Sequence, residues 1–133
     1  MRNILFIKSS KNGKRHLFVD EINAKIIFAY INCDARHRKK FRYISDIAIE
    51  GLRNTNLYDK EEINSKCKGV TAMKFFKGQE NDRIYCKEIT TTNGVFVIIA
   101  ATLLRRKKQT KLTQKETTII ERIASYEYEI PEF

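Results

Sequence analysis

Three strand-like runs in the second half of the chain constrain its fold most. They cover residues 71–77, 82–89 and 95–104, and turn-forming residues separate them. Asn93-Gly94 is a strong two-residue hairpin signal because it lies between two apolar runs. The pattern therefore predicts an antiparallel β-meander.

The middle run has two unlike faces. Alternate residues of a strand share a face, so Arg83, Tyr85 and Lys87 point one way while Ile84 and Cys86 point the other. We expect helices to cover the apolar face of this sheet. We expect a negatively charged molecule to meet the basic face.

Apolar residues at three- and four-residue spacing predict two antiparallel helices before the meander. The first helix is expected from about residue 17 to residue 31, after a short strand over 4–8. Its apolar stripe comprises Leu17 or Phe18, Ile22, Ile26 or Ile27, and Tyr30 or Ile31. The second helix is expected over 35–52, with Asp34 as its N-cap and Gly51 near its end.

Two capping-box patterns complete the assignment of elements. Asp59 and Glu62 predict a helical turn over 60–66, and Thr113-Gln114-Lys115-Glu116 predicts a final helix over 114–128. The chain is then one α+β domain spanning residues 1–133. Its order is an N-terminal strand, two antiparallel helices, an antiparallel meander and a C-terminal helix.

Charge indicates the kind of partner. Lys and Arg number 26 against 16 Asp and Glu, which gives a net charge of +10. This balance favours polyanions, with nucleic acid first, an acidic protein second and a membrane surface third. The cysteines at 33, 67 and 86 fit neither a disulfide framework nor a metal-binding spacing. The longest apolar run, 95–104, is too short to cross a bilayer as a helix. We expect a soluble cytoplasmic protein with no cofactor.

Short basic motifs follow one another in a fixed order at turns and strand ends. They are Asn12-Gly13-Lys14 after the first strand, Lys66-Cys67-Lys68-Gly69 before the meander, Asp82-Arg83-Ile84-Tyr85 in its middle strand, and Lys107-Lys108 with Gln109-Thr110-Lys111 after its last strand. This order resembles the RelE/HigB superfamily of bacterial toxins, and especially its phage-protein-like HigB branch. In that family a K-x-[KR]-G turn leads into a strand, an arginine opens the next strand, and adjacent lysines end the last strand.

The resemblance implies a RelE-like fold and a metal-independent mRNA interferase. Such an enzyme is an endoribonuclease that stops translation, often by cutting mRNA on the ribosome, and a cognate antitoxin protein holds it inactive. The ParE branch shares the fold, lacks the RNase residues and poisons DNA gyrase. A gyrase-directed toxin or a non-catalytic basic binding module is therefore the alternative function.

RNA cleavage by the 2′-hydroxyl needs a base, a cation on the phosphoryl oxygens and an acid for the leaving oxygen. Arginine suits the second role because its fork binds two phosphate oxygens, and crowded lysines lower one another's pKa. We assign phosphate stabilisation to Arg83. The other catalytic candidates are Lys66, Lys68 and Lys74 as base or orienting groups, and Lys107 or Lys108 as acid or backbone contact. The RNA-binding candidates are Lys77, Tyr85, Lys87, Arg105, Arg106 and Lys111.

Each assignment has a structural alternative. The basic run over 36–42 is equally consistent with a solvated helix face, and Arg83 with a cross-strand partner of Glu88 or Glu80. Tyr85 fits a half-buried sheet residue as well as a stacking platform. The convergence of basic residues on one predicted sheet face nevertheless favours an endoribonuclease over simple binding.

Overall fold

A computed structural model describes residues 1–106 and 111–133. The strands are β1 (Ile4–Ser9), β2 (Arg15–Asp20), β3 (Tyr58–Lys60), β4 (Val70–Phe75), β5 (Asp82–Thr90) and β6 (Phe96–Leu104). The α-helices are α1 (Ala24–Ile31), α2 (Ala35–Ile49) and α3 (Gln114–Ser125), and a 3-10 turn, η1 (Glu21–Asn23), precedes α1. The predicted α+β class is confirmed.

The six strands form one mixed sheet in the order β1-β2-β6-β5-β4-β3. β2 and β6 run parallel, and the other neighbouring strands run antiparallel. The predicted meander is β4-β5-β6, with Lys74 opposite Arg83 on the first pair of strands. Gly94, in the turn between β5 and β6, has a φ of +84°, a left-handed conformation that glycine adopts without steric cost. A turn at this point is confirmed, but the Gly94 N–H donates to the Thr91 carbonyl and the loop covers 91–95, so it is longer than the predicted two-residue hairpin.

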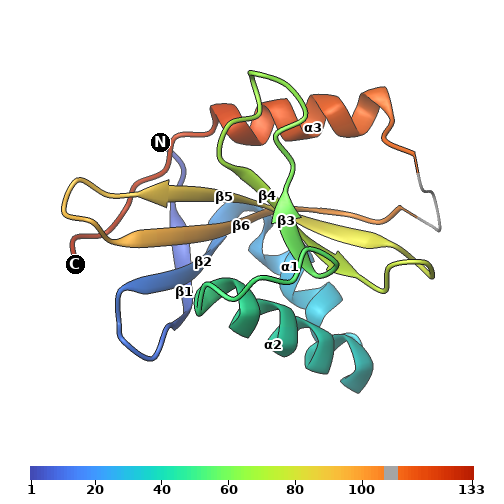
Figure 1. Ribbon diagram of the computed structural model, residues 1–133, viewed down its shortest axis with the longest axis horizontal. Helices are drawn as coiled ribbons and strands as arrows, with labels where there is room; N and C mark the ends of the chain where they lie inside the picture. The colour runs from blue at the N-terminus through green and yellow to red at the C-terminus, as the bar shows by residue number, and fades with distance from the viewer. Residues whose placement is uncertain (107–110) are drawn as a thin grey trace.

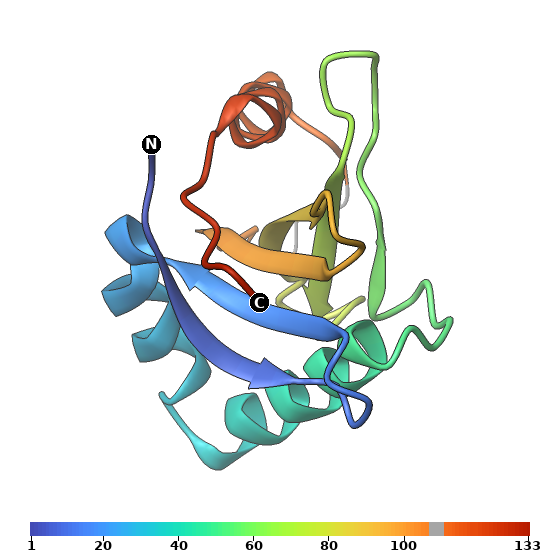
Figure 2. The same cartoon turned by 90° about the vertical axis from the view of Figure 1, so that its left-hand side faces the viewer.

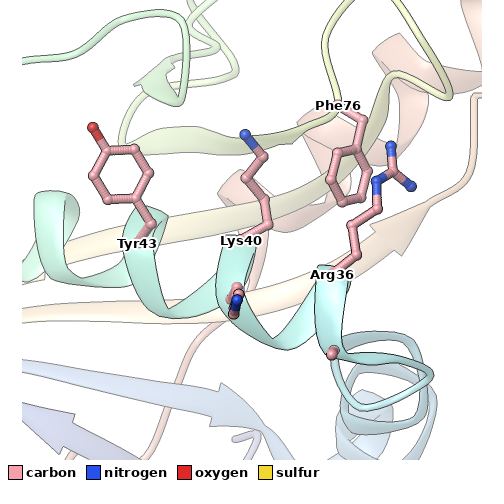
Figure 3. A pocket seen from close by; sticks show the side chains of 6 residues that line it. Arg36, Lys40, Tyr43 and Phe76 are labelled. Carbon is pink, nitrogen blue, oxygen red and sulfur yellow. The ribbon is translucent and has the colours of Figure 1, made fainter.

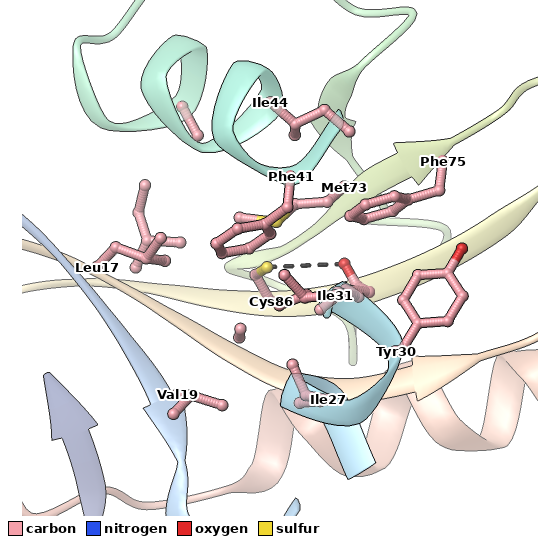
Figure 4. Packing of buried hydrophobic residues seen from close by; sticks show 14 of the residues in the cluster. Leu17, Val19, Ile27, Tyr30, Ile31, Phe41, Ile44, Met73, Phe75 and Cys86 are labelled. Carbon is pink, nitrogen blue, oxygen red and sulfur yellow. Dashed lines mark hydrogen bonds between the residues drawn. The ribbon is translucent and has the colours of Figure 1, made fainter. Parts of the chain in front are cut away.

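Helices lie on both faces of the sheet (Figures 1 and 2): α1 and α2 on one face, α3 on the other. The larger core joins α1 and α2 to side chains from β2, β4, β5 and β6 (Figure 4). Ile84 and Cys86 belong to this core, whereas Tyr85 belongs to the smaller core under α3 with Ile120 and Ile123. The predicted alternation along β5 is therefore confirmed. The expectation of an open basic face is wrong, because α3 covers it.

The predicted helix from residue 17 is wrong at its start. Leu17, Phe18 and Val19 lie in β2, between β1 and β6, and are almost wholly buried. A strand buried on both faces gives a continuous apolar run, and periodicity cannot separate such a run from a buried helix. Of the predicted apolar stripe, Ile22 is 67% exposed, whereas the alternative of Ile26 or Ile27 is met by Ile27, which is fully buried.

The predicted helical turn over 60–66 is also wrong. Residues 58–60 form β3, which pairs with β4, and an irregular loop follows. Asp59 accepts a hydrogen bond from the backbone N–H of Lys60, and Glu62 accepts one from that of Gly69. These two carboxylates therefore fix the loop before β4 instead of capping a helix.

The caps of the long helices follow the sequence signals. Asp34 accepts from the backbone N–H of His37 at the start of α2, and Thr113 accepts from that of Glu116 at the start of α3. α2 ends at Ile49 rather than Leu52, and Gly51 adopts a φ of +69° just beyond it. α3 ends at Ser125, three residues before its predicted end. Among the described residues, no helix combines the length and the apolar character needed to cross a membrane.

Candidate functional site

A small open cleft of about 270 Å³ lies where β5 begins, beside the segment that leads into α3. Segments far apart in the sequence supply its walls, since Arg83 belongs to β5, Glu61 follows β3 and Arg106 follows β6. The lining side chains are Glu61, Ile63, Arg83, Tyr85, Arg106 and Leu112. The fold thus brings two arginines and a carboxylate to one cleft.

Arg83 and Glu61 form the central pair of this cleft. Arg83 Nη1 donates to Glu61 Oε1 over 2.7 Å, and the two side chains are 13% and 15% exposed. Burial raises the pKa of the Glu61 carboxyl above its ordinary value, although the charges of Arg83 and Lys74 oppose the shift. Arg83 Nε is buried and has no hydrogen-bond partner among the described residues. The Nε–H donor of the Arg83 guanidinium is therefore left without an acceptor in the described part of the chain.

Lys74 lies next to this pair, opposite Arg83 in the sheet register. Its Nζ donates to the Thr55 carbonyl over 2.9 Å and lies 3.9 Å from Asp59 Oδ2. Burial lowers the pKa of Lys74, and the positive charge of Arg83 lowers it further. Lys74 therefore releases a proton more readily than a solvated lysine, which is the property required of a lysine in proton transfer.

A buried ion pair forms the wall of the cleft toward α3. Arg106 Nε lies 3.2 Å from Glu116 Oε1, and both side chains are 3% exposed. Tyr85 donates to Glu116 Oε2 over 3.4 Å, and its pKa is raised by burial first and by the Glu116 charge second. Behind the wall, Asp82 accepts from the Arg106 backbone N–H and from the Tyr30 hydroxyl. These contacts join the start of β5, the residue after β6 and the first turn of α3 at the wall of the cleft.

The structure brings together only part of the predicted site. Arg83, Lys74, Tyr85 and Arg106 lie at or beside the cleft. Tyr85 is 1% exposed, however, so its ring is not available to stack on an RNA base. The Arg106 side chain is likewise buried in its pair with Glu116, and does not present a free cation to RNA.

The other predicted residues that the structure describes are not among the side chains that line the cleft. Lys87 donates to the backbone carbonyls of Ala124 and Tyr126 at the end of α3, and this contact has a structural role. Lys77 donates to Asn56 Oδ1, and the Arg105 side chain is 63% exposed and 3.9 Å from Asp82. Lys66, Lys68 and Lys111 have exposed side chains in loops. Lys107 and Lys108 lie outside the described residues.

Sequence reasoning missed the acidic half of the site. Glu61 was not singled out, and Glu116 was read only as part of a helix cap. The structural alternative for Arg83 was a pair with Glu88 or Glu80, but its partner is Glu61. A local signal did exist for Glu116, because its position in the capping box fixed its place at the start of α3. No local pattern relates Glu61 to Arg83, since they are 22 residues apart.

Within residues 1–106 and 111–133, one group of side chains has ligand atoms close enough together to hold a metal ion. The ligand atoms of Cys33, Asp34 and His37, at the start of α2, lie within 4.8 Å of one another. Asp34 Oδ1 already accepts from the His37 backbone and lies 2.7 Å from His37 Nδ1. Capping of α2 accounts for this arrangement without a metal.

Comparison of the chain with protein-family models, with curated proteins and with solved structures gave no match. The resemblance to RelE/HigB toxins therefore remains a prediction from the sequence motifs.

Proposed function

We propose that this chain is the toxin component of a toxin–antitoxin system, with a RelE-like fold and a metal-independent endoribonuclease activity on mRNA. The observation that carries the proposal is the Arg83–Glu61 pair in an open cleft. Deprotonation of a 2′-hydroxyl needs a base, and a partly buried carboxylate with a raised pKa is a stronger base than a solvated one. An arginine beside it can stabilise charge on the phosphoryl oxygens.

Each step of the cleavage can be given to a side chain at this site. Glu61 takes the proton from the 2′-hydroxyl, whose oxygen attacks the adjacent phosphorus. Arg83 turns from Glu61 toward the phosphoryl oxygens as charge develops on them. Lys74, whose pKa is lowered, protonates the 5′-oxygen that leaves. The products are one strand with a 2′,3′-cyclic phosphate and one with a 5′-hydroxyl.

The net charge of +10 supports the two proposed partners. A basic surface attracts mRNA, with or without the ribosome, and it also attracts an acidic segment of an antitoxin. An antitoxin that is disordered when free could wrap a large part of this surface on binding.

The experiment is cell-free translation of a reporter mRNA with the purified chain, followed by mapping of the mRNA ends. We expect reporter synthesis to stop and the mRNA to be cut. Arg83→Lys is the informative variant because it keeps the charge opposite Glu61 but loses the fork. Intact mRNA with normal reporter synthesis would refute the proposal.

A second candidate function is a gyrase-directed toxin or a non-catalytic basic binding module. One observation favours it: Arg83 and Arg106 each face a carboxylate, and such pairing neutralises the cations that a phosphate would need. DNA supercoiling by purified gyrase in the presence of the chain tests this candidate. Inhibition of supercoiling together with intact mRNA would favour it over the endoribonuclease.

A further inference from the structure

A second site lies outside the cleft, along the surface of α2. It is an open groove of about 600 Å³, and the following residues line it: Ala35, Arg36, Lys39, Lys40, Tyr43 and Phe76. All of them except Phe76 belong to α2, and Phe76 directly follows β4. Figure 3 shows Tyr43, Lys40 and Arg36 in a row along the helix, with the Phe76 ring beside Arg36.

Cations and aromatic rings alternate in this groove. The Arg36 guanidinium carbon lies 3.5 Å from the centre of the Phe76 ring, and Lys40 Nζ lies 5.5 Å from it. Gln79 and Glu80 accept hydrogen bonds from the other side of Arg36 and fix the guanidinium plane. The Arg36–Glu80 ion pair therefore holds a flat guanidinium over the Phe76 ring and leaves Lys39 and Lys40 as the cations that can meet phosphates.

Phe76 adopts a backbone conformation that L-residues rarely take, with a φ of +56°. Its ring contacts His37 of α2 and Phe75 of β4 and is 8% exposed. Such strain persists only where the surroundings hold it, and it is common at binding sites. In this groove the strained backbone belongs to the residue whose ring lies under the Arg36 guanidinium.

Two further side chains make the groove accessible to a ligand. Tyr43 is 56% exposed, so a face of its ring is open to solvent. Lys39 is exposed and makes no ion pair within the part of the chain that the structure describes. Lysines beside an exposed aromatic ring are the features by which proteins bind a single strand, since phosphates meet the cations and bases stack on the ring.

We propose that the α2 groove binds single-stranded nucleic acid, with phosphates on Lys39 and Lys40 and a base stacked on Tyr43. An acidic protein segment would use the cations but would gain less from the exposed ring and the flat Arg36–Phe76 stack, so nucleic acid is the better fit. The inference goes beyond the proposed cleavage and does not depend on it.

The test is fluorescence anisotropy with a labelled 2′-O-methyl oligoadenylate of about 12 nucleotides, which cannot be cleaved through its 2′-oxygen. Binding is measured at several salt concentrations for the wild type and for Lys39→Ala/Lys40→Ala. Each neutralised phosphate contributes about 0.7 to the log–log salt slope. We expect the double variant to lose about 1.4 of that slope.

A charge-matched control separates the groove from the net charge. Lys115→Ala/Arg122→Ala removes two exposed cations from α3, and we expect its slope to stay near that of the wild type. Tyr43→Ala should weaken binding roughly 5- to 100-fold, and Tyr43→Phe should bind like the wild type. A DNA oligonucleotide of the same length is measured in parallel to identify the ligand. If the groove variants lose affinity only for the 2′-O-methyl RNA, the groove is assigned to RNA. If they lose affinity equally for RNA and DNA, the groove recognises the phosphates and bases that both share.

Two results would overturn the inference. One is an equal loss of slope in the control and groove variants. The other is tighter binding of poly-glutamate than of the oligonucleotide, without an effect of Tyr43→Ala, which would assign the groove to an acidic protein. Glu61→Gln separates this inference from the proposed function. It should abolish cleavage without changing binding to the groove.

Discussion

The Arg106–Glu116 pair offers the sharpest test of how the cleft is built. Arg106→Met removes the cation and leaves the Glu116 carboxylate only 3% exposed, and its other hydrogen-bond partner among the described side chains is the Tyr85 hydroxyl at 3.4 Å. Breaking a buried ion pair by removing one member costs about 3–5 kcal/mol, because the remaining charge stays buried. That is a large part of the roughly 5–15 kcal/mol that stabilises a typical domain.

Urea denaturation and thermal melting measure this loss directly. For a domain of this size, each kcal/mol lost from the free energy of unfolding lowers the melting temperature by about 3–5 °C. We therefore expect the melting temperature of Arg106→Met to fall by roughly 10–20 °C. Arg105→Met is the matched control. The Arg105 side chain is 63% exposed and 3.9 Å from Asp82, so its loss should cost less than about 1 kcal/mol.

The double variant Arg106→Met/Glu116→Leu separates a buried charge from lost packing. It replaces the pair with apolar groups of similar size, and we expect it to recover most of the stability that Arg106→Met loses. A loss below about 1 kcal/mol for Arg106→Met would refute the reasoning. It would mean that water reaches Glu116 and that Arg106 is available to a ligand.

Three other predictions follow from contacts outside this wall. Lys87→Met removes the ammonium that binds the last carbonyls of α3, and we expect a loss of about 1–3 kcal/mol and faster amide hydrogen exchange in that helix; unchanged exchange would contradict the role. Alkylation of the native protein should modify Cys33 alone, since the other two thiols are buried and burial raises the pKa of both Cys67 and Cys86; modification of all three without denaturant would contradict the packing. If Glu61 is the base, cleavage should slow as the pH falls through its raised pKa, because the carboxylate is then protonated. A cleavage rate independent of pH over that range would remove Glu61 from the mechanism.

Local sequence patterns predicted the elements whose signals are local. The turn at Asn93-Gly94, the alternation along β5 and the caps Asp34 and Thr113 each depend on a few consecutive residues, and all four were correct. The same kind of reasoning failed for β2. The side chains over 17–19 are buried by neighbours from both sides of the sheet, and their apolar run carries no period that distinguishes a strand from a helix.

The candidate site was predictable only in its basic half. Arg83 was identified from strand alternation and the family resemblance, and Lys74 as a basic residue of the preceding run; the register that places them opposite each other comes from the structure. The role of Lys87 depends on where α3 ends over the sheet, and the pairing of Arg83 depends on a loop that follows β3. Neither contact has a sequence signal, because each joins elements that only the folded chain brings together. The wrong expectation of an open basic sheet face has the same cause. The sequence pattern of α3 predicts its apolar stripe, but it does not predict which face of the sheet that stripe packs on.

We propose that Glu61 and Arg83 cut RNA through its 2′-hydroxyl. The most direct measurement is the chemistry of the ends left in an mRNA treated with the wild-type chain and with Glu61→Gln, with circular dichroism to verify that the variant is folded. We expect 2′,3′-cyclic phosphate and 5′-hydroxyl ends with the wild type, no cut at a nucleotide carrying a 2′-O-methyl group, and no cut by the variant. Ends carrying a 5′-phosphate, or equal cutting by folded Glu61→Gln, would contradict this proposal.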